Sequence, residues 1–352
     1  MSGVNPSLDA WREWVDLGRL VAWMDERSLE AGPIEAPARP PGGTQNLLLK
    51  FRRGEREFML RRPPPHPRMD GSETMRREAR VLGALADTDV PHPRLIAACP
   101  EEDVLGAAFY LMEPIEGFNP TVGLPPLHAG DPAVRHAMGL ALADGIAALG
   151  RVDHVAAGLS DLGRAEGFLE RQVGRWKKQL ASYADYEGWA GPGEIEGVDE
   201  VAAWLEAHRP ASFKPGIIHG DYHLANVLYR FDGPALAAIV DWELTTIGDP
   251  LLDLGWLMAT WPLPDAPPGE RLTVTPWEGF PTAAELVERY GAQTERDMRH
   301  MDWYAVLACF KLGIILEGTH ARAAAGKADK TTGDALHAQT LSLFRRALGW
   351  IG

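Results

Sequence analysis

The sequence contains little of what several protein classes require. Its only two cysteines, Cys99 and Cys309, are far apart and offer neither a disulfide framework nor a thiolate metal site. Basic residues number 35 against 49 acidic ones, which gives a formal net charge of −14. Because an acidic chain is poorly suited to nucleic acid or to an anionic membrane surface, we expect neither as a partner.

Long apolar runs and an N-terminal targeting signal are also missing. No run reaches the roughly 20 residues of a membrane span, and the first residues lack a basic stretch followed by an apolar one. These absences predict a protein of the reducing cytoplasm. What is present is ordinary for a soluble globular chain, with 45% hydrophobic and 24% charged residues. A length of 352 residues suits two domains or one bilobal unit.

Strand signals gather in the first third of the chain. Residues 46–51 and 57–61 flank a turn that contains Gly54, which is typical of a hairpin. Two further strands are expected at 95–99 and 107–112, and helices at 7–30 and 72–86, the second with Ser72 as its cap.

The chain beyond residue 113 has a helical pattern instead. Asp131 and Pro132 begin a strong helix, as cap and first-turn residue. Other helices are expected at 164–183, 199–208, 249–261, 282–290, 294–325 and 331–348. The sequence therefore predicts an α+β protein of two lobes: a small β-rich lobe at 1–113, with a leading helix, and a larger, mainly helical lobe at 114–352.

Three polar residues stand beside short β-type apolar runs. Asp221 and Asn226 lie five apart within residues 217–229, and Asp241 follows the apolar run 236–240. Phosphoryl transfer needs one carboxylate to orient an attacking hydroxyl, and an amide oxygen with a second carboxylate to hold magnesium. Unpartnered, such groups would each cost roughly 1–3 kcal/mol. This grouping predicts a site in which Asp221 is catalytic and Asn226 and Asp241 bind metal.

Neighbouring polar residues fit supporting roles. We expect His219 to brace the loop that holds Asp221, and Glu243 to lie close to the metal. Asp249 is typical of a helix cap. Asp253, four residues later, is placed to turn inward and hold the catalytic loop by its backbone.

A metal-dependent hydrolase is the competing interpretation. His219 and His223 are four residues apart, and with Asp241 they form a possible zinc-binding set. Histidines at that spacing converge only on a helix, and Gly220 among β-type residues argues against one.

The motifs resemble the aminoglycoside phosphotransferase and choline kinase-like family. The likeness covers roughly residues 30–350 and is strongest in the catalytic and metal motifs. Its closest branch is the kinase-like domain found fused to some acyl-CoA dehydrogenases. The matching stretches are residues 58–64, 77–82, 109–117, 157–164, 219–226 (HGDYHLAN), 240–243 (VDWE) and 248–254 (GDPLLDL).

The resemblance implies a bilobal, protein-kinase-like fold and a small-molecule kinase that uses ATP, or GTP, with Mg²⁺. It places Asp221 at the catalytic position and Asn226 and Asp241 on the metal. It further implies that Glu78 pairs with a strand residue on the phosphates. Backbone around Met112, Glu113 and Ile115 would meet the adenine, and Gly42, Gly43 and Thr44 would cover the phosphates.

One departure from the family pattern concerns that strand residue, which is lysine in many relatives. Here the position is Arg61, and the only lysine before residue 177 is Lys50, on the preceding strand. Arginine keeps the charge, but it is longer and its fork is rigid. Arg62 is the neighbouring alternative, since adjacent strand residues face opposite ways. A nucleotide-binding pseudokinase is therefore a third interpretation.

The acceptor remains open between several small hydroxylated molecules. Acidic residues in 184–198 suit an aminoglycoside-like or choline-like amine, although a solvated acidic loop is the better explanation of them. The branch resemblance indicates a hydroxyacyl metabolite instead. Residues 114–130 and 261–281 are further candidates for lining the acceptor site. The oligomeric state is not predicted.

Overall fold

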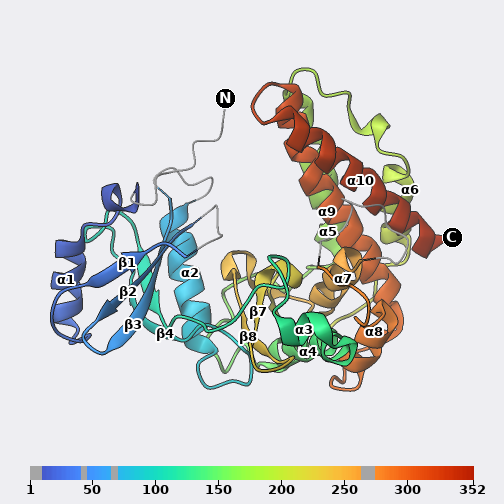
Figure 1. Ribbon diagram of the computed structural model, residues 1–352. Helices are drawn as coiled ribbons and strands as arrows, with labels where there is room; N and C mark the ends of the chain where they lie inside the picture. Colours follow the sequence, from blue (N-terminus) through green and yellow to red (C-terminus); the bar gives the residue numbers. More distant parts are fainter. Residues whose placement is uncertain (1–9, 41–45, 65–69, 263–273) are drawn as a thin grey trace. The chain divides into compact units, whose positions relative to one another are not determined.

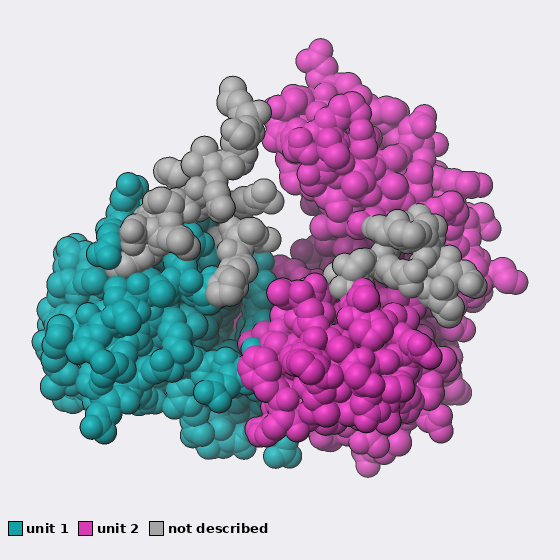
Figure 2. Space-filling view, in the orientation of Figure 1, with its two compact units in different colours: residues 1–117, 237–243 teal, residues 118–236, 244–352 magenta. Residues whose placement is uncertain are grey.

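The chain folds as two compact units (Figures 1 and 2). The computed structural model describes residues 10–40, 46–64, 70–262 and 274–352. Unit 1 comprises Met1–Gly117 with Ala237–Glu243, and unit 2 comprises Phe118–Leu236 with Leu244–Gly352. Compared with the predicted boundary at 113, unit 1 also includes residues 114–117 and the distant segment 237–243. Sequence order could not indicate that segment, because it joins unit 1 through contacts alone, such as Ile239 N–H to Pro91 O at 2.9 Å.

Unit 1 is built on a five-stranded antiparallel sheet in the order β1-β2-β3-β5-β4. The predicted hairpin is present, with Gly54 at φ +58° in its turn. Residues 35–38, for which no strand was predicted, contribute an edge strand. The strands are β1 (Glu35–Ala38), β2 (Leu47–Arg53), β3 (Arg56–Arg62), β4 (Leu95–Cys99) and β5 (Phe109–Met112).

The two faces of this sheet carry different chemistry. Phe58 and Leu60 of β3 are buried in an apolar core together with Trp23 of helix α1 (Leu17–Glu26). Because side chains alternate along a strand, Arg61 points to the opposite face. That face is covered by helix α2 (Gly71–Ala84), which carries Glu78. The alternation thus directs Arg61 of β3 toward Glu78.

Both helices of unit 1 differ from their expected bounds. In place of one helix over 7–30, a 3-10 turn (Ala10–Glu13) precedes α1, and Asp16 caps α1 through Arg19 N–H. Helix α2 is capped by Asp70, whose carboxylate accepts from Glu73 N–H at 3.0 Å, so the prediction of Ser72 was wrong. The Ser72 hydroxyl instead accepts from Ala108 N–H at 3.2 Å, which joins α2 to the residue before β5.

Unit 2 is mainly helical, as expected. Asp131 caps α4, accepting from Ala133 N–H at 2.8 Å. Strands β6 (Gly216–Ile218) and β9 (Thr246–Gly248) pair antiparallel, and β7 (Val227–Tyr229) follows the loop after β6. Strand β8 (Leu236–Ile239) begins at the last residue of this part of unit 2 and continues into unit 1. The helices are α3 (Pro126–Gly130), α4 (Pro132–Arg151), α5 (Glu170–Ala181), α6 (Val198–Ala207), α7 (Leu251–Thr260), α8 (Ala283–Gly291), α9 (Met301–Ala324) and α10 (Lys330–Ile351).

Helix α9 is the centre of unit 2 and packs against α5, α6, α7 and α10 (Figure 1). Residues 298–324 are long and apolar enough to cross a membrane, but 67% of the apolar window is buried inside the protein, as in the core helix of a globular unit. Both cysteines, Cys99 and Cys309, are buried and free.

Close packing of α7 on α9 depends on a glycine. A Cβ atom at Gly255 would lie 2.6 Å from the backbone of Tyr304. We predict that Gly255→Ala lowers the free energy of unfolding by about 2 kcal/mol, because the two backbones must separate. Gly174→Ala in α5 is the matched control, since its Cβ meets nothing within 4 Å, and we expect a gain of about 0.5–1 kcal/mol. Urea denaturation measures both, and equal effects would contradict the packing account.

Candidate active site

The predicted catalytic residues lie on the loop of residues 219–226, between β6 and β7 of unit 2. The loop turns sharply at Gly220, whose φ is +89° and whose Cβ would meet Leu244 O at 2.7 Å. Only glycine fits such a position without strain. The turn places Asp221 directly after a buried strand.

Asp253 of α7 holds this loop through its backbone. Its carboxylate accepts the N–H of His219 at 2.6 Å and the N–H of Gly220 at 2.9 Å. The side chain is buried, and burial raises the pKa of Asp253, while these two bonds and the nearby His219 oppose that rise. The predicted inward turn of Asp253 is confirmed.

Asp221 is held on three sides. Its carboxylate oxygens lie 3.2 Å from His223 Nε2 and 3.0 Å from Asn226 Nδ2, and its own N–H donates to His219 Nδ1 at 3.3 Å. The Nδ1 atom of His223 accepts the N–H of Ala225 at 3.1 Å. His223 therefore carries its proton on Nε2 and donates it to Asp221. Sequence reasoning treated His223 only as a loop residue or zinc ligand.

The environment keeps Asp221 ionised. Burial raises its pKa, but the hydrogen bond from His223 and the positive neighbours, among them Lys311, lower it to about 2. A carboxylate this acidic is a weak base. It is suited to orienting a hydroxyl rather than removing its proton early.

The Asn226 amide is oriented by the same loop. Its Nδ2 atom donates to the Asp221 carbonyl at 2.9 Å and to the Asp221 carboxylate at 3.0 Å. Because the amide nitrogen is committed to Asp221, the opposite oxygen is the group that Asn226 presents to a metal.

Lys311 of α9 is a neighbour that no sequence signal indicated. Its Nζ atom donates to Gly220 O at 3.0 Å and lies 4.3 Å from the ring centroid of Trp256. Burial lowers the pKa of Lys311 to about 8, although Asp221 and Asp253 act in the opposite direction. Ninety-one residues separate Lys311 from Gly220, and only the packing of α9 beside the loop brings them together.

Unit 1 carries a second charged group around Arg61. Arg61 lies 2.8 Å from Glu78 Oε2 and donates to Asp241 Oδ1 at 2.8 Å, while the hydroxyl of Tyr110 donates to Glu78 at 2.6 Å. Arg61 and Tyr110 are cross-strand partners on β3 and β5, so both face α2. Burial lowers the pKa of Arg61, but Glu78, Tyr110 and Asp241 raise it overall.

Asp241 combines this ion pair with an unusual backbone. Its φ is +67°, a left-handed conformation that costs a residue other than glycine of order 1–3 kcal/mol and is often found at functional sites. Donor oxygens of Asp241, Glu78 and Glu243 lie within 4.8 Å of one another. Burial raises the pKa of Glu243, and Asp241 adds to the shift. Such an oxygen-rich group fits a hard divalent cation.

The structure decides between the candidate partners of Glu78. The pairing of Arg61 with Glu78 is confirmed. Arg62 points to the other face, where it donates to Trp14 O, and Lys50 pairs with Glu57 at 2.9 Å. Tyr110, which joins the pair, went unpredicted, although strand alternation places it on the same face as Arg61.

The other residues predicted to contact the nucleotide are described only in part. Gly42, Gly43 and Thr44 lie outside the described residues. Met112 ends β5, and the N–H of Glu113 donates to Arg94 O at 2.9 Å. The Glu113 N–H is thus engaged within unit 1, and Ile115 follows two residues later.

The two histidines of the zinc set proposed for a hydrolase each have one ring nitrogen engaged within the catalytic loop. Within the described ranges, two groups of three potential metal ligands lie close together. One is Glu78, Asp241 and Glu243, and the other lies on α9 and α10. The backbone N–H groups of Asp221 and Ala225 occupy the Nδ1 atoms of His219 and His223.

Known proteins share this architecture. The chain is 28% identical over 294 residues to acyl-CoA dehydrogenase family member 10 of Mus musculus; the match covers 82% of the chain but only 27% of that relative. A putative aminoglycoside phosphotransferase from Ralstonia eutropha JMP134 has a similar structure, with a TM-score of 0.79, 29% identity and coverage of 96% and 97%. The GDP and kanamycin complex of APH(2")-IIIa matches with a TM-score of 0.62 and 15% identity over 95% and 99% of the chains.

The fold prediction is confirmed by these structures, which share the bilobal α+β, kinase-like fold. The sequence profile of the phosphotransferase enzyme family matches residues 38–304, which include Arg61, Asp221 and Asp241. The match covers most of the chain. The chain belongs to the phosphotransferase enzyme family.

Proposed function

We propose that this protein transfers the γ-phosphoryl group of ATP, or GTP, to a hydroxyl group of a small molecule. The observation that carries the proposal is the fixed geometry of Asp221. Two side chains hold its carboxylate, and Asp253 holds the loop behind it. Preorganised groups of this kind contribute to catalysis because they need not reorganise during the reaction.

In this proposal Asp221 orients the acceptor hydroxyl and takes its proton late. The transition state of phosphoryl transfer is loose, so little base strength is required, which agrees with the low pKa of Asp221. His219 braces the backbone of Asp221 and His223 fixes its carboxylate. Neither histidine needs to contact the substrate.

The magnesium ligands are proposed to be the Asn226 amide oxygen and the Asp241 carboxylate. Their chemistry fits the ion, because Mg²⁺ prefers oxygen donors and is usually bound through only one or two protein carboxylates. Bound magnesium would neutralise charge on the nucleotide phosphates, and the nucleotide supplies the phosphoryl group. Glu243, close to Asp241, is placed to bind a water of the ion.

Arg61 is proposed to bind the phosphates while Glu78 and Tyr110 hold its guanidinium. In this structure Arg61 also pairs with Asp241, so one guanidinium contacts both carboxylates. Gly42, Gly43 and Thr44 are proposed to cover the phosphates, and backbone groups of Met112, Glu113 and Ile115 to meet the adenine.

The acceptor is proposed to be a small hydroxylated metabolite. One structural neighbour binds kanamycin, which supports an aminoglycoside-like or choline-like molecule. The relative is an acyl-CoA dehydrogenase family member, which supports a hydroxyacyl compound instead. The chain matches only 27% of that relative's length, so a shared acceptor is part of the proposal.

Asp221→Asn is the direct test of the mechanism. We predict a loss of about 10²–10⁴-fold in magnesium-dependent phosphoryl transfer to water or to an acceptor, because the amide cannot accept the proton. The measured product is ADP. Nucleotide affinity, measured by calorimetry, should stay within about threefold. Asp232→Asn, at an exposed ion pair, is the control. Full activity in Asp221→Asn would refute the mechanism, and no activity in the wild type with any acceptor would favour a pseudokinase.

Substitutions at the adjacent residues Arg61 and Arg62 are predicted to have very different effects on nucleotide affinity. Arg61→Ala should weaken nucleotide binding by about 2 kcal/mol, or roughly 30-fold, because a buried charged hydrogen bond is lost. Arg61→Lys should lose less, since the charge remains. Arg62→Lys should leave nucleotide affinity unchanged. An equal loss at both positions, measured by calorimetry, would show that Arg61 has no special role.

The lowered pKa of Lys311 predicts that activity falls at alkaline pH. With its pKa at about 8, the ammonium is charged below that pH and neutral above it. The rate of nucleotide hydrolysis should therefore fall as pH rises through about 8, because the charge beside Gly220 and Asp221 is lost. Lys311→Arg, which stays charged, should remove this limb of the pH profile. The assignment fails if the limb is unchanged in that variant, once circular dichroism has shown that it folds.

A further inference from the structure

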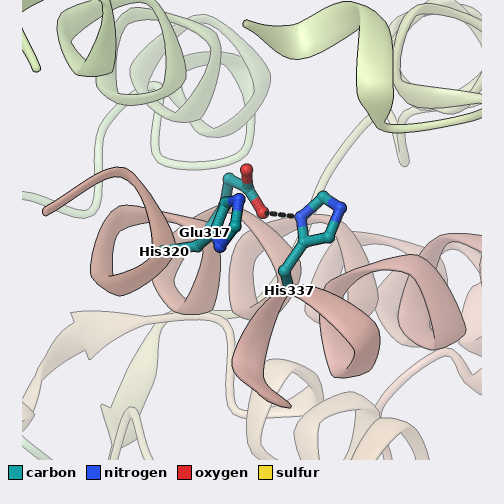
Figure 3. Close-up of side chains that lie close together, drawn as sticks. All are labelled: Glu317, His320 and His337. Atoms are coloured by element: carbon teal, nitrogen blue, oxygen red, sulfur yellow. Dashed lines mark hydrogen bonds and ion pairs between the residues drawn. The ribbon is translucent and has the colours of Figure 1, made fainter. Parts of the chain in front are cut away.

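A group of metal-ligand side chains lies in unit 2 on α9 and α10, apart from the residues assigned to phosphoryl transfer. Glu317 and His320 of α9 lie close to His337 of α10 (Figure 3). One donor atom from each lies within 4.8 Å of the other two. Two imidazoles with a carboxylate form a donor set suited to zinc and similar divalent metals.

The spacing on both helices places these donors on facing surfaces. Glu317 and His320 are three residues apart, as are Asp334 and His337 on α10. Residues at that spacing share one helix face, and carboxylate–histidine pairs on facing helices are a recurrent way to build a metal site in a bundle. Asp334 Oδ1 lies 3.7 Å from His320 Nδ1, close enough to supply a fourth ligand after a side-chain rotation.

Helices α9 and α10, which carry the group, are in close contact on both sides of it along their length. The Thr340 hydroxyl donates to Gly313 O at 3.0 Å, one turn beyond His337. On the other side, a Cβ at Gly333 would lie 2.5 Å from Ala323 Cβ. Sites on closely packed helices hold their ligands more accurately than sites on loops.

The charge of Glu317 also requires explanation. Its side chain is fully buried, and its oxygens accept from Trp189 Nε1 at 2.8 Å and pair with His337 Nδ1 at 2.7 Å. A buried carboxylate is costly unless it is paired with a positive charge. His320 Nδ1 is buried without a hydrogen-bond partner, and its ring stacks on that of His337 at 4.4 Å.

A hydrogen bond from His337 to Glu317 explains part of this arrangement, but it leaves the buried Nδ1 atom of His320 without a hydrogen bond. We propose that Glu317, His320 and His337 bind a divalent transition metal, best fitted by Zn²⁺, with Asp334 or water completing the coordination. The Trp189 indole would orient the ligating carboxylate, as outer hydrogen bonds commonly do. Zinc donors lie roughly 3.2–3.5 Å apart in a tetrahedral site, so Glu317 and His337 would separate slightly on binding. The ion would tie α9 to α10.

The test is zinc binding to the whole, tag-free chain after chelator treatment. Competition with a fluorescent chelator gives the affinity, and elemental analysis gives the stoichiometry. Millimolar Mg²⁺ is kept in the buffer to occupy the oxygen-rich group at Asp241. His320→Ala is the decisive variant, because His320 makes no hydrogen bond through Nδ1 and its loss leaves the Glu317–His337 pair intact.

The expected result is one zinc per chain with a dissociation constant of about 1 µM or tighter. The affinity should fall by about tenfold or more in His320→Ala and in His337→Ala. His136→Ala, from an exposed His136–Glu285 pair at 2.9 Å, should bind zinc as the wild type does. Absence of micromolar binding, or equal affinity in wild type and His320→Ala, would overturn the proposal. Neither outcome touches the proposed phosphotransferase, whose readout is ADP release.

Discussion

The catalytic loop keeps its shape because the buried carboxylate of Asp253 accepts two consecutive backbone N–H groups, those of His219 and Gly220. A loop lacks the ladder hydrogen bonds of a strand, so its buried N–H groups need other partners. Here one side chain of α7 supplies them, and the left-handed turn at Gly220 then aims Asp221. Asp221, Asn226 and His223 take their positions from this loop, and Lys311 of α9 donates to it, so its anchoring governs the chemistry of unit 2.

Charge balance plays the corresponding part in unit 1. Arg61 is the cation shared by Glu78 and Asp241. Because Arg61 and Glu78 are buried, removal of either would leave the other as an unpaired buried charge. The position is lysine in many members of the family that the sequence resembles, and the rigid fork of arginine lets one residue contact both carboxylates. Asp241 meets this fork from a strained backbone. The arrangement is consistent with a phosphate-binding group that holds its carboxylates in place before nucleotide binds.

Much of this was predictable from sequence, for local reasons. The hairpin of unit 1, the cap at Asp131 and the inward turn of Asp253 follow from turn chemistry, capping chemistry and residue spacing. The Arg61–Glu78 pair follows from the resemblance to the family. The Ser72 cap was wrong because Asp70, two residues earlier, offers a better acceptor. Lys311, Tyr110 and the segment 237–243 depend on tertiary packing. The role of His223 was hidden because a histidine's partner is set by loop geometry, which spacing alone does not define.

The central claim is that this chain moves a phosphoryl group from a nucleotide to a hydroxyl. The most direct measurement is mass spectrometry of acceptor candidates, aminoglycosides, choline and hydroxyacyl thioesters, after incubation with the wild-type protein, Mg²⁺ and ATP or GTP. The account predicts that one class gains a single phosphoryl group as an equal amount of nucleoside diphosphate appears. An acceptor changed without any nucleotide present, such as a hydrolysed ester, would contradict it.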